Sequence, residues 1–271
     1  MAFSLKKLFG NKGIEGEAVP AKQKLTAAEE VWDLAKTILI AVAIALVLRM
    51  VVFQPFNIPS GSMRPNLLVG DFLVVSKPTF GYSRASLIYP FTRMDIHGRV
   101  FASEPKRGDI VVFKNRKDGN KDYIKRVIGM PGDTVQMKDG RLLINGKPVQ
   151  KEFLGMQDVI CDDQPVPAPT YRETLPNGVS YLVQECAGDD GPLDNVGPYQ
   201  VPMGRFFMMG DNRDHSQDSR VTSQVGYVPL EDIVGRAERL FFSVDGHKAK
   251  IWELWKWPFA IRYGRILDKV E

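Results

Sequence analysis

The sequence predicts a mainly β fold, with one transmembrane helix near the N-terminus followed by an antiparallel domain of packed sheets or a partly open barrel. Three observations support this prediction. A single apolar run stands near the N-terminus, short runs rich in β-branched and aromatic residues follow it, and no convincing helical period occurs beyond it. The 24 glycines and 18 prolines among 271 residues predict many turns.

The apolar run extends from Thr37 to Leu48 and resumes after Arg49. A helix over 31–54 is long enough to span a bilayer with some tilt, and Pro55 then stops it. The alternative is a buried core helix, because the uninterrupted stretch is only twelve residues long. A core helix, however, is rarely apolar on every face. A cleaved signal peptide is not expected, since the run starts too far from the first residue and no small-residue cleavage site follows it.

Basic residues around this helix predict its orientation. Those on its N-terminal side are Lys22, Lys24 and Lys36. After the helix, Arg64 is the only basic residue before the first expected strand of the domain. Cytoplasmic flanks carry the excess of Lys and Arg, so this weak bias places the polar, disordered tail 1–30 in the cytoplasm and 55–271 outside it.

The rest of the chain is expected to form short strands joined by turns. The expected strands are Asp71–Val75, Asp109–Phe113, Asp122–Ile128 and Arg236–Val244. A hairpin is expected around Arg141–Ile144, because the turn pairs Asp139-Gly140 and Asn145-Gly146 flank it.

Residues 150–200 differ in composition from the rest. Six prolines with acidic clusters between them predict an inserted, loop-rich subdomain. Cys161 and Cys186 lie in it, 25 residues apart. Two interpretations are open: a disulfide, which an oxidising compartment would permit, or two unrelated buried thiols.

Composition argues against two kinds of ligand. The formal net charge of +4 is small and evenly spread, and no basic arm or aromatic–basic repeat occurs, so nucleic acid is not an expected partner. The two cysteines and the scattered histidines His97, His215 and His247 show no metal-ligand spacing, so no metal site is expected.

One serine and one lysine are the candidates for chemistry. Ser62 follows Gly61 in a segment that Pro59 and Pro65 constrain. A serine hydroxyl needs an adjacent base to become a good nucleophile. Lys125 lies among apolar strand residues, where burial would lower its pKa towards that of a general base. Taken singly, each has a plainer interpretation, as a polar loop serine and an exposed strand lysine.

A third segment, Gly210–Arg220, is strongly polar although it follows an apolar strand. A generic surface loop does not explain this density of hydrogen-bonding groups at a strand end. The segment contains His215, which raises a competing hypothesis, a Ser62–His215–Asp triad that uses Asp214 or Asp218.

Together these segments resemble the bacterial type I signal peptidase family, also called leader peptidase. The resemblance covers nearly the whole chain after Val31, through motifs at Pro59–Asp71, Arg107–Val111, Tyr123–Asp133 and Gly210–Arg220. Their order after an anchor argues against chance agreement. The resemblance implies an antiparallel β catalytic core and removal of signal peptides from translocated preproteins. It also implies a Ser–Lys dyad without a catalytic histidine, metal or cofactor.

The resemblance further implies roles for individual residues. Ser62 looks like the nucleophile and Lys125 like the general base, while Ser60 and the Ser62 backbone N–H would form the oxyanion hole. Ser216 looks like the residue that orients the lysine. The residues that would support the last motif are Gly210, Asp211, Asn212, Arg213, Asp218 and Arg220, the last two as an ion pair. Those that match substrate-pocket positions are Phe56, Ile58, Pro59, Tyr123 and Ile124.

The implied substrates are preprotein signal peptides with alanine-like residues at −1 and −3, bound by strand addition. The implied location is the bacterial inner membrane, with a single span and the catalytic domain on the extracytoplasmic, periplasmic side. The lipid bilayer and the secretion translocon are further implied partners. The best-known Gram-negative members have two spans, whereas this chain has room for one. The segment Trp252–Phe259 is expected either to rest in the bilayer interface or to pack on the β core.

Two other functions are alternatives. A dedicated Ser–Lys processing protease of the conjugation type would have a similar sequence. A non-catalytic, membrane-anchored β adaptor would have no need for Ser60, Ser62, Lys125 and Ser216 together. A self-cleaving repressor also uses Ser–Lys chemistry, but it would carry a DNA-binding module in place of the anchor.

Overall fold

The computed structural model describes residues 26–87, 98–161, 164–246 and 253–270. It has two compact units, Met1–Ile44 and Ala45–Glu271. Its helices are α1 (Ala27–Val51) and α2 (Trp257–Ala260). Its strands are β1 (Phe53–Asn57), β2 (Asp71–Ser76), β3 (Ile110–Asn115), β4 (Lys121–Gly129), β5 (Thr134–Lys138), β6 (Arg141–Ile144), β7 (Lys147–Pro148), β8 (Gln150–Cys161), β9 (Gln164–Thr174), β10 (Ser180–Gln184), β11 (Val196–Gln200), β12 (Arg205–Met209), β13 (Val228–Pro229) and β14 (Ile233–Ser243).

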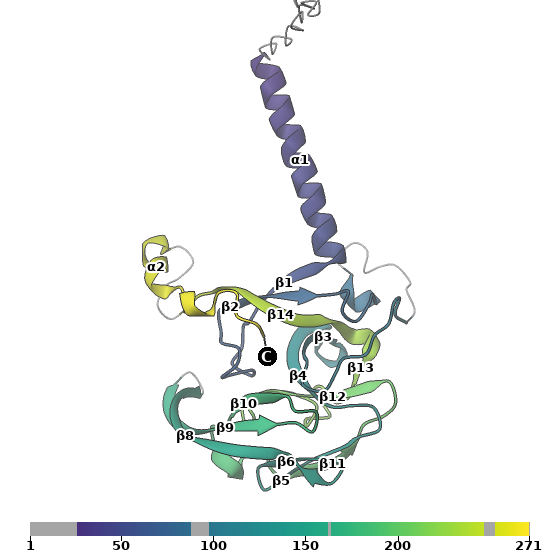
Figure 1. Ribbon diagram of the computed structural model, residues 1–271, viewed down its shortest axis with the longest axis vertical. Helices are drawn as coiled ribbons and strands as arrows, with labels where there is room; N and C mark the ends of the chain where they lie inside the picture. Colours follow the sequence, from purple (N-terminus) through teal and green to yellow (C-terminus); the bar gives the residue numbers. More distant parts are fainter. Residues whose placement is uncertain (1–25, 88–97, 162–163, 247–252, 271) are drawn as a thin grey trace, which may run out of the picture. The chain divides into compact units, whose positions relative to one another are not determined.

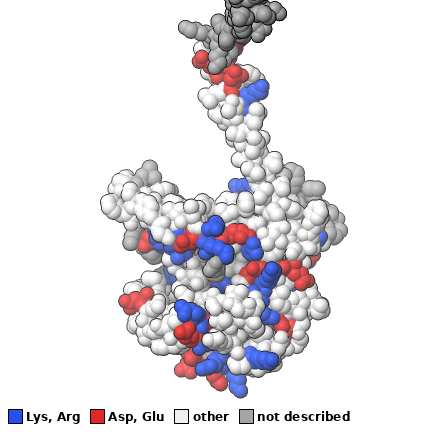
Figure 2. All heavy atoms as spheres, in the orientation of Figure 1, with Lys and Arg blue, Asp and Glu red and all other residues white. Residues whose placement is uncertain are grey.

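Helix α1 is long and apolar enough to cross a membrane. Its candidate span, Ala27–Arg49, has 23 residues and a mean hydropathy of 2.2, and none of the most apolar window is buried. Figure 2 shows the middle of this helix without charged side chains. Acidic residues in the first turn, Glu29 and Glu30, and Arg49 in the last turn complement the helix dipole. Its length and hydropathy favour a membrane span over the alternative of a buried core helix.

The helix boundaries differ from the predicted 31–54. The helix begins at Ala27 and ends at Val51, so it starts within the segment predicted to be a tail. Pro55 does not end it, because Pro55 already lies in β1 and pairs with Val74 of β2. β1 is the first strand in the sheet order, and an edge strand tolerates a residue without an N–H.

The second unit is built from three antiparallel sheets (Figure 1). The seven-stranded sheet has the order β1-β2-β14-β3-β4-β12-β13. A three-stranded sheet, β10-β9-β8, and a four-stranded sheet, β11-β5-β6-β7, lie at the lower end of the unit in this view. The predicted mainly β fold is confirmed.

Local turn chemistry sets the β5–β6–β7 meander as predicted. Asp139, Gly140, Asn145 and Gly146 all have positive φ, between +49° and +73°. Two-residue turns with both central residues in this region match the right-handed twist of a hairpin, and Asn-Gly and Asp-Gly pairs adopt them at low cost.

The prediction of a loop-rich subdomain over 150–200 is wrong. β8 and β9 form a long hairpin, in which Gln150 pairs with Thr174 and Cys161 with Gln164. Three of the six prolines lie on β9 at alternate positions, in the part of this strand that β10 does not reach. There they can point their N atoms to the open side, so proline does not interrupt the pairing with β8.

The two faces of the seven-stranded sheet carry separate apolar cores. Val112 of β3 belongs to the cluster that includes Ile58 and Leu240, whereas its neighbour Val111 belongs to the cluster that includes Val127 and Phe206. Side chains of a strand alternate between faces, so Lys125 lies on the same face as Val127. The lysine therefore extends from the face of β4 that Val127 helps to pack.

Candidate active site

Ser62 and Lys125 meet in a buried site. Lys125 Nζ lies 2.7 Å from Ser62 Oγ and 2.9 Å from the carbonyl oxygen of Ile124. Ser62 is 7% exposed and Lys125 is 3% exposed. Ser62 comes from the turns between β1 and β2, and Lys125 from the rigid centre of β4, so the structure joins two residues that are 63 positions apart.

Burial changes the proton affinity of the lysine. The pKa of Lys125 falls from 10.5 to about 8, chiefly because of desolvation; Asp218 and Asp211 oppose this shift, and Arg220 adds to it. An ammonium group in a dry site is less stable than its neutral amine. A substantial fraction of this lysine is therefore neutral, and able to accept a proton, near pH 8.

Ser60 lies beside the nucleophile candidate. Its Oγ is 3.5 Å from Ser62 Oγ, at the long limit of a hydrogen bond, and its side chain is exposed. A hydroxyl held this weakly is free to rotate towards another acceptor near Ser62.

Asn212 fixes the backbone around Ser62. Its backbone N–H donates to the Ser62 carbonyl at 3.1 Å, and its side-chain amide donates to the Gly61 carbonyl at 3.1 Å. These two bonds join the last polar motif to the turn that carries the serine. They give Asn212 a definite positioning contact, which its motif alone did not specify.

Ser216 is buried next to the same turn. A side chain at Gly210 would lie 2.2 Å from Ser216 Oγ and 2.5 Å from the Ser62 carbonyl, so both atoms approach the glycine closely. Ser216 Oγ makes no hydrogen bond of good geometry in the described part of the chain, although it lies close enough to Asp218 to help lower the pKa of that carboxyl, and the acceptors of Lys125 are Ser62 and Ile124. The hydroxyl is thus near the site without bonding the lysine in this structure.

Asp218 and Arg220 form the predicted ion pair. Arg220 Nη2 and Nε donate to the two carboxylate oxygens at 2.9 and 3.0 Å, and both side chains are buried. Burial opposes the charge of Asp218, but Arg220 outweighs it and lowers the pKa of this carboxyl. Asp218 also accepts the Gly210 N–H at 3.0 Å. The pair therefore holds both ends of the motif together.

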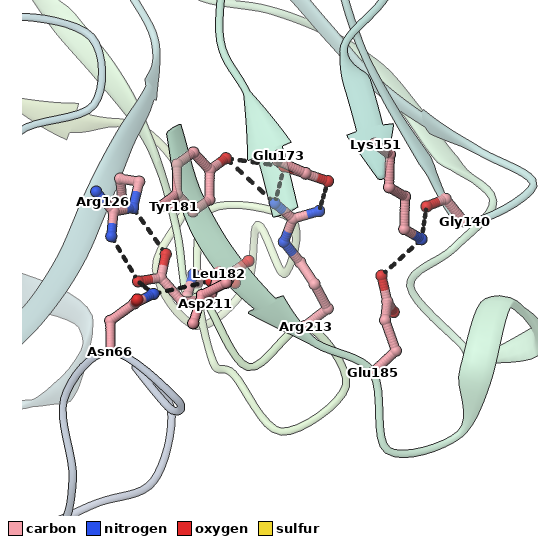
Figure 3. Close-up of polar contacts among 12 residues, drawn as sticks. Asn66, Arg126, Gly140, Lys151, Glu173, Tyr181, Leu182, Glu185, Asp211 and Arg213 are labelled. Carbon is pink, nitrogen blue, oxygen red and sulfur yellow. Dashed lines mark hydrogen bonds and ion pairs between the residues drawn. The ribbon is translucent and has the colours of Figure 1, made fainter. Parts of the chain in front are cut away.

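A second buried ion pair joins Asp211 to Arg126, a residue to which the sequence gave no role of its own. Arg126 donates to both oxygens of Asp211 at 2.8 Å, and Asn66 Nδ2 donates to the same carboxylate at 2.7 Å (Figure 3). The place of Arg126 in the mostly apolar run Tyr123–Ile128 was a signal for it. Removing one partner of such a pair leaves an uncompensated buried charge, so the pair holds β4 and the polar loop in register.

A third ion pair extends the network into the small sheet. Arg213 donates to both oxygens of Glu173, at 2.8 and 2.5 Å, and Tyr181 donates its hydroxyl to Glu173 at 2.8 Å (Figure 3). Attraction to Arg213 outweighs burial and lowers the pKa of Glu173. No sequence signal pointed to Glu173, which lies in the segment predicted to be loop-rich.

The predicted pocket residues divide between the two faces of the sheet. Phe56 and Ile124 pack against the cluster that contains Ile58, which is itself only 2% exposed. Tyr123 packs against the opposite cluster, because adjacent strand residues point to opposite faces. Pro59 is exposed. The five residues therefore do not line a single surface.

Cys161 and Cys186 form a disulfide, which settles the two alternatives for these residues. His215 offers a ring nitrogen within 4.8 Å of both sulfur atoms. Disulfide sulfurs are not thiolate ligands, so this group is not a metal centre. The described hydrogen bonds place Lys125, and not His215, at the Ser62 hydroxyl. His97 and His247 lie outside the described residues.

The C-terminal aromatic segment is only partly packed. Trp257 contacts Phe242 with ring centroids 6.2 Å apart. Trp255 and Phe259 are 70% and 82% exposed. Trp252 lies outside the described residues. The segment thus combines a ring that packs on β14 with two exposed rings.

Comparison with known proteins places the chain in a family. The profile described as "Signal peptidase, peptidase S26" matches residues 31–242. A signal peptidase I of Rickettsia typhi is 38% identical over 243 residues, covering 84% of this chain and 90% of that protein. A signal peptidase I of Rickettsia akari is 35% identical over 255 residues, covering 89% and 92%.

A crystal structure of a signal peptidase I from Enterococcus faecalis is 25% identical to this chain. It covers 49% of this chain and 97% of that one, with a TM-score of 0.29, which is too low to support a structural argument. The matches of sequence are sufficient by themselves. The chain belongs to the signal peptidase family, peptidase S26.

Proposed function

We propose that the chain is a membrane-anchored serine endopeptidase that removes N-terminal signal peptides from translocated preproteins, with Ser62 as nucleophile and Lys125 as general base. The observation that carries this proposal is the 2.7 Å contact between Lys125 Nζ and Ser62 Oγ in a buried site. A Ser–Lys dyad is the general mechanism of this family.

In this mechanism the neutral Lys125 amine accepts the Ser62 hydroxyl proton while Oγ attacks the scissile carbonyl carbon. The resulting ammonium then donates that proton to the departing amine, which leaves an acyl-enzyme. Water attacks the ester next, with Lys125 again taking the proton, and Lys125 returns that proton to Ser62 Oγ as the C–Oγ bond breaks and the carboxylate product leaves. The Ile124 carbonyl, 2.9 Å from Nζ, keeps the amine directed at the serine through these transfers.

The oxyanion that forms is stabilised by the Ser62 backbone N–H and the Ser60 hydroxyl. Loss of one such donor typically costs about 10²–10³ in rate. The loose 3.5 Å contact of Ser60 with Ser62 supports this role, since the hydroxyl gives up little when it turns to the oxyanion. Ser216, buried and without a hydrogen bond of good geometry, would accept from Lys125 once the amine is protonated.

The signal peptide adds as a strand beside β4. β12 pairs with β4 only from Arg126 to Gly129, so the far side of Lys121–Lys125 has no strand partner in the described chain. A peptide in this position presents its −1 and −3 side chains to one face. Phe56 and Ile124 pack on the same core, so the pockets for small side chains lie on their face and not on that of Tyr123.

The catalytic unit faces the extracytoplasmic side of the bacterial inner membrane, beside the secretion translocon, with α1 as a single span. The Cys161–Cys186 disulfide supports this side, because disulfides persist in oxidising compartments. The basic residues before α1 support a cytoplasmic N-terminus. The exposed rings of Trp255 and Phe259 would rest in the bilayer interface.

Cleavage of a preprotein in liposomes tests the dyad. Ser62→Ala and Lys125→Ala should each reduce cleavage to background, whereas His215→Ala and the exposed strand control Lys121→Ala should retain it. If His215→Ala abolished cleavage and Lys125→Ala did not, the base would be His215 and the proposed mechanism would be wrong. Absence of cleavage by the wild type on several preproteins would instead favour a dedicated processing protease.

A further inference from the structure

Three carboxyl groups from separate segments converge away from the dyad. Glu185 follows β10, Asp194 precedes β11, and Asp214 lies in the polar motif Gly210–Arg220. Each offers one oxygen, and these oxygens all lie within 4.8 Å of one another. Glu185 and Asp194 have no exposed surface, and Asp214 is half-buried. Acidic groups on an ordinary surface loop would instead separate into solvent.

Each of these carboxyl groups has one buried oxygen without a partner. The atoms are Glu185 Oε2, Asp194 Oδ1 and Asp214 Oδ1, and none makes a hydrogen bond within the described residues. The other oxygens are satisfied: Asp194 Oδ2 accepts the Gly191 N–H at 2.6 Å, and Asp214 Oδ2 accepts the Ala187 N–H at 2.7 Å. A buried carboxylate oxygen without a partner is costly. The backbone thus holds the carboxylates of Asp194 and Asp214, and Lys151 holds that of Glu185, while one oxygen of each remains available.

Among the described residues, one lysine forms ion pairs at this cluster. Lys151 Nζ contacts Glu185 at 3.1 Å (Figure 3), but the same ammonium also contacts the exposed Asp189 at 2.7 Å. Across the described residues, no ion pair involves Asp194 or Asp214. Lys151 therefore divides its single positive charge between Glu185 and Asp189.

Each of the two neighbouring arginines is paired with another carboxylate. Arg213 is held by both oxygens of Glu173, and Arg220 by both oxygens of Asp218.

We propose that Glu185, Asp194 and Asp214 bind a divalent cation, with calcium the ion that fits best. Calcium prefers carboxylate and carbonyl oxygens and accepts six to eight of them in irregular geometry, completed by water, whereas magnesium requires a near-ideal octahedron. Half-buried Asp214 gives the ion access from solvent. Gly191 lets the chain approach closely here, because a side chain on it would lie 2.2 Å from Asp214 Oδ1.

The position of Asp214 would connect a bound ion to the motif that holds the Ser62 turn. Asp214 is two residues after Asn212, which binds the turn carrying Ser62, and two residues before Ser216. A bound ion would tie this motif to the connection between β10 and β11. Its role is to hold the loop, and it takes no part in the peptidase chemistry. The alternative for the same cluster is a proton shared among the carboxyl groups.

Terbium luminescence and thermal melting test the proposal on full-length protein in detergent, after removal of divalent ions. Terbium should bind once per chain and be excited through Tyr181 or Tyr171, and calcium should displace it with a Kd on the order of 10⁻⁴–10⁻³ M. Calcium at about ten times its Kd should raise Tm by about 3–6 °C, and magnesium at equal concentration by less.

Charge-removing variants locate the ion. Asp194→Asn keeps the acceptor for the Gly191 N–H but should weaken calcium binding by at least about tenfold, since ligand charge sets affinity. The matched control is Asp190→Asn, an exposed residue of the same connection, which should bind like the wild type. Asp214→Asn replaces Asp194→Asn if the latter does not fold.

Two results would overturn the proposal. The first is a wild type that binds neither terbium nor calcium, and the second is a site that survives in both Asp194→Asn and Asp214→Asn. A third result would assign the cluster to a shared proton. In that case the wild-type Tm would not change with calcium but would change with pH near 7, and the Tm of Asp194→Asn would show no such pH dependence. These measurements do not depend on signal-peptide cleavage, so they stand or fall separately from the proposed function.

Discussion

Replacing Lys125 by methionine should change the pH dependence of stability as well as abolish catalysis. The pKa of this lysine falls from 10.5 to about 8 in the folded protein, chiefly because of desolvation. At about 1.36 kcal/mol per pH unit, this corresponds to about 3 kcal/mol of unfavourable free energy when the lysine is charged in both states. Methionine fills a similar volume and carries no charge.

The sign follows from the proton count. Below pH 8 the lysine is protonated in both the folded and the unfolded protein, so the wild type bears the whole cost of burying the charge. Between about pH 8 and 10.5 the unfolded chain binds more protons, and the free energy of unfolding of the wild type therefore rises with pH. Relative to Lys125→Met, the wild type should gain about 2 kcal/mol between about pH 7 and 9.5.

Thermal melting of both proteins in detergent measures this difference. The wild type should gain about 4–8 °C in Tm relative to Lys125→Met over that pH range, given about 2–4 °C per kcal/mol for a unit of this size. Subtracting the two curves removes the other titrating groups and the pH-independent loss of the bond to Ser62. The wild-type kcat/KM for a preprotein should rise through the same pKa, about 8.

Lys121→Met is the matched control, because Lys121 lies on the same strand but is exposed and bonded to Asp118, which raises its pKa. Its Tm difference from the wild type should not grow in favour of the wild type with rising pH. A flat difference for Lys125→Met would show that the lysine keeps an ordinary pKa. The argument that burial makes it a base would then be wrong.

Three further changes test other contacts. Asn212→Ala removes the side-chain bond to the turn before Ser62 and should lower kcat about 3–10-fold, with KM nearly unchanged, in steady-state preprotein cleavage. Replacing Cys161 and Cys186 together by serine opens a loop of 25 residues and should cost about 3 kcal/mol in denaturant unfolding. In liposomes with brominated lipids, Trp255→Phe should remove more of the fluorescence quenching than Trp257→Phe does, since Trp257 packs on β14.

A different result would contradict each of these three predictions. Asn177→Ala, which loses a comparable amide bond to a backbone carbonyl far from the dyad, should keep wild-type kcat, and an equal loss there would point to a general effect. Unchanged unfolding in the double serine variant would mean that the disulfide adds nothing to stability. Equal quenching losses for the two tryptophan variants would argue against contact of Trp255 with the bilayer interface.

Several features follow from local sequence alone. The apolar run, the Asp-Gly and Asn-Gly turns and the apolar strand around Lys125 each act over a few residues, through backbone preference and side-chain periodicity. The motifs around Ser62 and Gly210–Arg220 marked the chemistry because their residue types are uncommon in such positions. For these features the prediction and the structure agree closely.

Predictions from local sequence were wrong where the outcome depended on which segments pack beside a residue in the fold. The prolines of β9 suggested loops, but they are tolerated because one side of that strand has no partner. Tyr123 and Ile124 were grouped by motif, although alternation sends them to opposite faces. Glu173 had no local signal, since its importance comes from Arg213, 40 positions away.

The sequence by itself determined the class of fold, the long apolar helix and the turns, and it pointed to Ser62 and Lys125 as the candidate dyad. The tertiary structure alone decided that Lys125 reaches Ser62 in a dry site, that Asn212 holds the serine turn, and that the two cysteines are joined. The physical reason is the separation along the chain over which each interaction acts. Propensity and periodicity are encoded among near neighbours, whereas burial, charge compensation and hydrogen-bond partners arise only when distant segments pack together.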